Sequence, residues 1–163
     1  VWGIGCDATN AAAIEKVYAL KERDRSKPFV LLVSSISMLK KYVGFIHPRV
    51  ETLLGHHIRP LTIIYDEPKN LPKNVLGLDG SVAIRIVLDE FCRQLIERFG
   101  KPVVATAASI GEQPLPRHFG EISSAVIEGV NFVAKYRQME KEMSELSVIA
   151  RLSEEEELVF LRE

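Results

Sequence analysis

Short apolar runs alternate along this chain with longer stretches in which apolar and polar residues mix at helical spacing. Residues 29–33, 61–65 and 82–87 are almost wholly aliphatic, β-branched or aromatic, and turn-forming or polar residues bound them. Continuous apolar runs of this length are typical of strands that are covered on both faces. Further strands are predicted at residues 103–105, near 131–134, and at 147–152 and 158–161, the last two joined by the acidic residues 153–157.

The helices are predicted from their caps as well as from their spacing. Thr9 or Asn10 can cap a helix that runs to about residue 23, and Asp89 can cap one over residues 89–99. Pro48 suits the first turn of a helix that ends near residue 54. Less regular segments are helices at 37–43 and 118–128, loops at 66–80 and 112–116, and a loop or frayed helix at 135–145.

The alternation of strands and helices predicts an α/β fold, with helices packed on a sheet. A chain of 163 residues without repeats or linkers suits one domain, residues 1–163. The chain opens directly on Val1-Trp2-Gly3-Ile4-Gly5-Cys6, an apolar run with no polar lead-in. We therefore expect that a segment which precedes this run is missing.

Charge and composition narrow the class of function. The 21 basic residues against 22 acidic ones give a net charge of −1, so the whole chain has no basic field for nucleic acid. No apolar run approaches the roughly 20 residues that span a membrane, and no signal peptide is present, which predicts a cytoplasmic protein without a membrane partner. Cys6 and Cys92 are interpreted as free, buried thiols in a reducing compartment.

No metal-binding pattern is visible in the sequence. The four histidines are neither paired at metal-ligand spacing nor close to a carboxylate cluster: His47, His56, His57 and His118. Nucleophile-elbow, P-loop and dinucleotide-binding motifs are also missing. We therefore expect no protein-held metal site.

Four cations gather at the end of the first predicted helix. Lys21, Arg23, Arg25 and Lys27 lie within seven residues. Cations are favourable at a helix C-terminus even on a solvated face, so this is one interpretation. The other is a pocket for phosphate or another anion. Spacing alone leaves both open.

Two further features favour a ligand. Arg85 interrupts the apolar strand at 82–87, where a charge is costly unless it is paired or faces a cleft that holds an anion. The small residues from Thr106 to Ser109 follow the strand at 103–105. Ligands of α/β folds lie beyond the carboxyl ends of strands, so this run is either a ligand contact or a tight turn.

Several segments together match the motifs of one family, in order along the whole chain. They are residues 1–8 (V-Y-G-L-G-x-D-A), Lys21-Glu22-Arg23 (K-x-R), Lys27-Pro28-Phe29 (N/K-P-L), Arg59-Pro60-Leu61-Thr62 (a shortened P-G-P-L-T), the strand with Arg85, Thr106-Ala107-Ala108-Ser109 (T-S-A-N), residues 147–152 (S-T-V-V-D-L) and Leu161-Arg162 (L-R). On these motifs the chain resembles the YrdC/TsaC/Sua5 family of threonylcarbamoyl-AMP synthases. The resemblance implies a YrdC-like twisted, open, mixed sheet with flanking helices.

The resemblance also implies an activity. Members of that family condense L-threonine, bicarbonate and ATP into threonylcarbamoyl-AMP and pyrophosphate, and the product feeds the t6A modification of tRNA. Mg²⁺ would arrive with the ATP rather than in a protein cage. Possible partners are RNA or tRNA and the downstream proteins that transfer the group. Positioning and charge stabilisation would carry the catalysis, without a covalent nucleophile.

Individual roles follow from the matched motifs. Lys21 and Arg23 would be catalytic, since they would hold phosphates and the intermediate. The resemblance implies ATP contacts from Arg23, Lys27, Ser81, Ser109 and Arg162. It implies threonine contacts from Arg85, Thr106 and Ser147.

The sequence departs from the family pattern at three places. The Pro-Thr-Asp/Glu-Thr motif and the strand that carries it are expected before residue 1 and are missing. The S-A-N motif is Ala107-Ala108-Ser109, and the S-T pair is Ser147-Val148. An alternative is therefore a diverged relative that binds nucleotide or RNA without synthase activity. A simple RNA-binding module is a third possibility, which the net charge disfavours.

Overall fold

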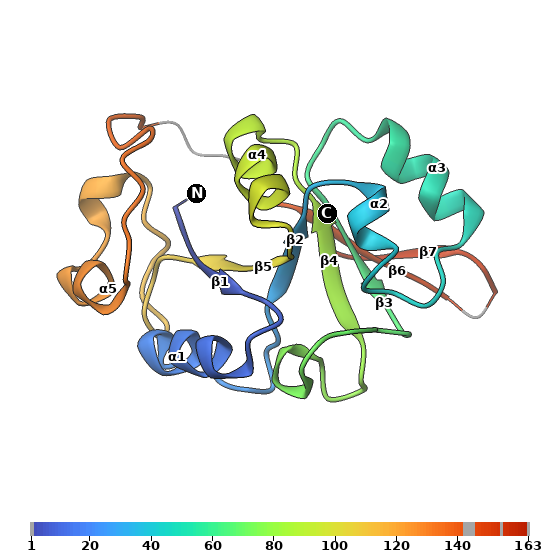
Figure 1. The fold of residues 1–163 in the computed structure, drawn as a ribbon, viewed down its shortest axis with the longest axis horizontal. Helices are drawn as coiled ribbons and strands as arrows, with labels where there is room; N and C mark the ends of the chain where they lie inside the picture. Colours follow the sequence, from blue (N-terminus) through green and yellow to red (C-terminus); the bar gives the residue numbers. More distant parts are fainter. Residues whose placement is uncertain (1, 142–145, 154, 163) are drawn as a thin grey trace.

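A sheet of seven strands organises the molecule, and helices flank it (Figure 1). The computed structural model describes residues 2–141, 146–153 and 155–162. The strand order is β1-β5-β2-β4-β3-β6-β7, in which β2–β4 and β3–β6 are parallel pairs and the other neighbours are antiparallel. This mixed, open sheet confirms the predicted α/β class.

The elements follow one another as the sequence pattern predicts, with exceptions given below. The strands are β1 (Gly3–Asp7), β2 (Val30–Val33), β3 (Leu61–Tyr65), β4 (Val82–Ile86), β5 (Val103–Ala107), β6 (Val148–Leu152) and β7 (Leu158–Arg162). The helices are α1 (Ala11–Lys21), α2 (Ile36–Leu39), α3 (Pro48–His56), α4 (Glu90–Phe99) and α5 (Ser124–Gly129), with 3-10 turns η1 (Lys73–Val75) and η2 (Phe119–Glu121). Figure 1 shows α1 and α5 near one end of the sheet, α2 and α3 near the other, and α4 between them.

Side-chain caps fix where the two longest helices begin. The Asn10 side chain accepts a hydrogen bond from the backbone amide of Ala13 at 3.1 Å, so Asn10 rather than Thr9 caps α1. Asp89 caps α4 by accepting from the amide of Cys92 at 2.9 Å. Each cap satisfies a backbone donor that the helix itself cannot pair. The predicted starts of both helices are confirmed.

Two predictions between residues 118 and 134 are wrong. The helix predicted over 118–128 begins only at α5, because the backbone at Ser123 is extended and its hydroxyl accepts from the amide of Val126 at 3.4 Å. Serine competes for backbone donors in this way and so favours a cap over a helix interior. Residues 131–134 are irregular and pair with no strand in the described chain, because an apolar run becomes a strand only beside a partner.

The charged segment predicted as a loop or frayed helix at 135–145 contains a turn at residues 136–139. Tyr136 in this turn stacks on Phe91 of α4, with ring centroids 4.5 Å apart. Arg137 forms an ion pair with Asp89 at the start of α4. The rest of this prediction, at positions 142–145, and position 154 of the acidic connection lie outside the described residues.

Side-chain alternation gives the sheet a covered face and an open face. A row of aligned residues on the covered face, Val104, Leu31, Ile84 and Ile63, is at most 2% exposed. The open face is formed by the neighbouring positions of each strand, which are smaller or polar. Its two central rows are Gly5-Ala105-Val30-Ala83-Ile64-Arg151 and Asp7-Val103-Leu32-Arg85-Thr62-Ile149-Arg162. The apolar core therefore commits one face, and the other remains for a ligand.

Edge strand β1 approaches β5 too closely for side chains at its glycines. A Cβ on Gly5 would lie 2.8 Å from the carbonyl oxygen of Val104 and 2.9 Å from Cγ1 of Val103. One on Gly3 would lie 3.0 Å from the carbonyl oxygen of Thr106. The Gly3-Ile4-Gly5 sequence thus has a steric cause.

We expect Gly5→Ala to destabilise the protein by about 1–3 kcal/mol, because the added methyl group displaces the backbone of β5. The measurement is the free energy of unfolding in urea. Gly55→Ala is the matched control, since nothing lies within 4 Å of its Cβ position in α3, and alanine should stabilise that helix by about 0.5–1 kcal/mol. Equal stability of the Gly5→Ala variant and wild type would show that β1 does not pair this closely.

Candidate functional site

Polar side chains from four segments align on the open face of the sheet. Arg85 of β4 is the cross-strand partner of Thr62 of β3, and through Ile149 the same row reaches Arg162 of β7. Paired residues of neighbouring strands point to the same face, so these side chains share one surface. Ser147 lies directly before β6 and completes the set. We call Arg85, Thr62, Ser147 and Arg162 the arginine row.

Arg85 is a largely buried cation without a counterion. Within the described residues it forms no hydrogen bond and no ion pair. Burial lowers the pKa of its guanidinium, the nearby Cys92 thiol opposes this, and the positive Arg162 lowers the pKa further. A desolvated guanidinium beside a second one is unfavourable in the free protein and favourable as soon as an anion binds. The arginine row is therefore suited to a carboxylate or a phosphate.

Arg162 is held in place by the segment that precedes β6. Its Nε and Nη2 atoms donate to the carbonyl oxygen of Ser147 at 3.1 and 2.7 Å. Nη2 also lies 3.2 Å from the Ser147 hydroxyl, which accepts from the Thr62 hydroxyl at 2.9 Å. The family resemblance assigned Arg162 to the nucleotide and Ser147 to threonine, but the two residues are bonded to each other.

Lys21 lies at the end of α1 and is 4% exposed. Its Nζ atom donates to the carbonyl oxygens of Ala107, at 2.6 Å, and Ser109, at 2.5 Å. Burial lowers the pKa of this amine to about 8, and the charge of Arg23 adds to the effect. Lys21 therefore connects α1 to the small-residue turn after β5, where Ser109 itself is buried.

Arg23 is oriented by the chain that leads into β2. Its Nε donates to the carbonyl oxygen of Lys27 at 2.7 Å and its Nη2 to that of Pro28 at 3.2 Å. The guanidinium also lies over the ring of Phe29, 5.1 Å from its centroid. The side chain of Lys27 is exposed. We call Lys21, Arg23, Ala107 and Ser109 the lysine cluster.

Glu22 separates the two cations in a left-handed conformation, with φ 50° and ψ 39°. Its amide donates to the carbonyl of Ala19 and that of Arg23 to the carbonyl of Tyr18, which is a Schellman end for α1. Glycine is the usual residue at this position, so glutamate adds strain where the chain turns into the lysine cluster.

Strand register shows how far apart the two groups lie. Val103 of β5 aligns with Leu32 of β2 and with Arg85 of β4. Ala107, whose carbonyl Lys21 binds, is four residues farther along β5, at the level of Ser81 before β4. Four residues of strand span about 13 Å. The lysine cluster and Ser81 are therefore at one end of the sheet, and the arginine row is at the other.

Thr106 lies apart from the residues with which the resemblance grouped it. It pairs with Ile4, on the covered face, so its side chain points away from the face of Arg85. Ser81 is buried, and both its amide and its hydroxyl donate to Asp79, at 3.1 and 2.6 Å. Asp79 in turn forms an ion pair with Arg151, which also binds Asp66. Neighbouring Ser81 and Arg151 hold the pKa of Asp79 well below its usual range.

The Asp79–Arg151–Asp66 network was not predicted from the sequence. The three residues come from separate loops and strands, and isolated charges in turn-rich segments give no signal of their pairing. The network holds Ser81 against the end of β4.

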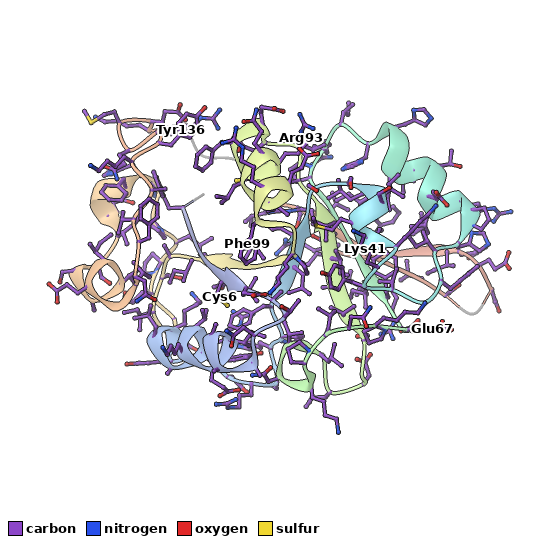
Figure 2. The ribbon with its side chains drawn as sticks, in the orientation of Figure 1. Cys6, Lys41, Glu67, Arg93, Phe99 and Tyr136 are labelled. Carbon is purple, nitrogen blue, oxygen red and sulfur yellow. The ribbon has the colours of Figure 1, made fainter. Side chains whose placement is uncertain are left out.

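Both cysteines are free thiols, as predicted, and Figure 2 labels Cys6 on β1. Burial raises the pKa of Cys6 to about 11, with a smaller effect from the charge of Asp7. Burial also raises the pKa of Cys92 to about 11, with smaller effects from Asp89. Neither thiol is a nucleophile at neutral pH.

Two other features bear on the class of site. No group of three or more histidine, cysteine, aspartate or glutamate side chains in the described residues is arranged to hold a metal ion. No helix in that same part of the chain has the length and apolar character needed to cross a membrane. A hollow of about 130 Å³ beside α3 and β3, which Phe45, His47 and Val50 help to line, contains none of the predicted site residues.

We expect Arg85→Met to stabilise the free protein by about 1 kcal/mol, because it removes a desolvated charge that has no partner. Thermal and urea unfolding without ligand measure this. Arg151→Met is the matched control and should destabilise, because it leaves Asp66 and Asp79 without their cation. A loss of stability in Arg85→Met would show that Arg85 has a structural role.

We expect Glu22→Gly to stabilise the protein by about 1 kcal/mol, because glycine adopts the left-handed conformation without strain. Urea unfolding measures the change. Lys16→Gly, at an exposed interior position of the same helix, is the control and should destabilise by about 1 kcal/mol. Similar losses in both variants would contradict the strain at Glu22.

Comparisons with known proteins agree with this architecture. The profile of the Sua5/YciO/YrdC family, described as "Telomere recombination", matches residues 1–163. A threonylcarbamoyl-AMP synthase from Psychromonas ingrahamii is 34% identical over 113 residues, which are 68% of this chain and 59% of that protein. The chain thus spans less than two thirds of this relative's length.

Solved structures share the fold. A double variant of P. abyssi Sua5 superposes with a TM-score of 0.87 at 22% identity, over 98% of this chain and 46% of that one. P. abyssi Sua5 complexed with L-threonine gives a TM-score of 0.78 at 24% identity, over the same shares of the two chains. With the profile match over its whole length, the chain belongs to the Sua5/YciO/YrdC family.

Proposed function

We propose that the protein is an L-threonylcarbamoyladenylate synthase, which forms threonylcarbamoyl-AMP and pyrophosphate from L-threonine, bicarbonate and ATP. The observation that carries this proposal is the unpartnered Arg85 beside Arg162 on the open face. An anionic group is missing there, and the carboxylate of an amino acid meets that need. The relatives named threonylcarbamoyl-AMP synthase and the P. abyssi Sua5 complex with L-threonine support the same choice.

The two ends of the open face suit the two ends of the product. Arg85 and Ser147 would bind threonine, whereas Lys21, Arg23 and Ser109 would surround the phosphates, with Lys27 and Ser81 beside them. The separation of about 13 Å along the strands fits a product that carries an amino acid at one end and a nucleotide at the other. Arg162, assigned to ATP by resemblance, and Thr106, assigned to threonine, are retained as proposals with the positions described above.

The chemistry needs placement and positive charge. The threonine amine combines with bicarbonate to give a carbamate and water. A carbamate oxygen then attacks the α-phosphorus of ATP, a new P–O bond forms, and the bond to the pyrophosphate oxygen breaks. Fixed cations that face the phosphates stabilise the charge in this step. Lys21 and Arg23 are already oriented by backbone carbonyls, so they need little rearrangement. Mg²⁺ would enter as part of the ATP substrate.

A second candidate is a relative that binds nucleotide or RNA and has lost the synthase activity. The observation that favours it is the Ala107-Ala108-Ser109 turn, whose two carbonyls occupy the Lys21 amine. Ala107 lacks the hydroxyl of the family motif, and one lost ligand hydrogen bond costs about 0.5–1.5 kcal/mol. In the primary proposal, a product made in the cytoplasm passes to tRNA and the proteins that complete the t6A modification.

Purified protein should release pyrophosphate from ATP only when L-threonine and bicarbonate are both present. Arg85→Ala and Arg23→Ala should each reduce this release at least a hundredfold, because each removes a cation from one end of the site. The assay is coupled detection of pyrophosphate, with omission of each substrate in turn.

Arg93→Ala is the matched control. This arginine lies on α4 (Figure 2), pairs with Glu90, and should leave the rate unchanged. ATP binding without any threonine-dependent release would support the second candidate and reject the synthase.

A further inference from the structure

The hydroxyl of Thr62 is a buried polar group with one partner. Thr62 is fully buried in β3, and in the described residues its hydroxyl bonds only the Ser147 hydroxyl, at 2.9 Å. The neighbouring positions Leu61 and Ile63 are apolar and pack in the core. A threonine that touches no solvent can contact no ligand directly, so any role in binding must pass through Ser147.

The direction of this hydrogen bond follows from what each hydroxyl can satisfy. If Ser147 donated to Thr62, the Thr62 proton would be buried without an acceptor, which is costly. If Thr62 donates, it leaves only an unfilled lone pair, which costs less. Thr62 is therefore the donor and Ser147 the acceptor.

The Ser147 oxygen then has both lone pairs in use. One accepts from Thr62 and the other from Nη2 of Arg162, at 3.2 Å. A hydroxyl has two acceptor positions and one proton, so only donation remains open to Ser147. Arg85, the cross-strand partner of Thr62, borders the same surface.

We propose that Thr62 is a positioning residue that makes Ser147 a dedicated hydrogen-bond donor to an acceptor oxygen of bound L-threonine. This inference rests on the proposed function, since it takes the arginine row as the amino-acid end of the site. Thr62 sets the orientation of the Ser147 proton, and Arg162 fixes the Ser147 backbone through its carbonyl oxygen.

The test is Thr62→Val, which keeps the shape of the side chain and removes its hydroxyl. The dissociation constant of L-threonine should rise about three- to tenfold, as the loss of one oriented hydrogen bond predicts, with the constant for ATP within twofold of wild type. In the steady state, KM for threonine should rise while kcat changes less. Thr62→Ser should restore threonine binding. Thr52→Val, which removes a hydroxyl bonded to Pro48 at an exposed site of α3, should change neither constant.

A double-mutant cycle separates positioning from general packing. In a Ser147→Ala background, Thr62→Val should have no further effect on threonine binding, because the residue it acts through is gone. Additive losses would overturn the proposal, as would equal weakening of threonine and ATP. If Thr62→Val does not fold, Thr62→Ala takes its place in the cycle.

Wild-type protein provides the reference for both proposals. If it fails to bind L-threonine, by calorimetry with ATP and bicarbonate present, the proposed function and this inference are both overturned. If wild type binds threonine and Thr62→Val binds it equally well, only the role of Thr62 is overturned.

Discussion

The register of the central strands is the constraint on which the rest of this structure depends. Because β5, β2, β4 and β3 pair without offset, one set of alternating positions becomes a continuous apolar surface and the other remains open. A shift of one residue in β4 would exchange Arg85 for Ile84 and bury the guanidinium in the core. The same pairing that closes the core therefore also assigns the cations to the ligand face.

Stability and function oppose each other at both ends of that face. Arg85 is desolvated without a counterion, Lys21 is buried against two carbonyls, and Glu22 holds a conformation that glycine would adopt more easily. Each of these features costs free energy in the unliganded protein and keeps a charge in the place where an anion would be bound. The apolar core on the covered face offsets these costs.

The sequence predicts the parts of this protein that depend on local pattern. The apolar runs identify six of the strands, and Asp89 identifies the start of α4, because alternation and capping are local effects. The unusual position of Arg85 within an apolar strand also identifies a site residue. The sequence does not predict that Thr62, Ser147 and Arg162 bond one another, since they are separated by up to 100 residues and their contact is created by sheet order. It also mistakes 131–134 for a strand, because pairing partners are not visible in one segment.

The position of β6 and β7 in the sheet has a consequence for the order of folding. β6 pairs in parallel with β3, which lies more than eighty residues earlier in the chain, and β7 reaches the sheet only through β6. Contacts between such distant segments raise the contact order and form slowly. During synthesis the ribosome would release β1 to β5 well before this C-terminal hairpin. The half of the open face that carries Arg162 and Ser147 is thus assembled last, so a nascent chain with most of its core in place still lacks the amino-acid end of its site.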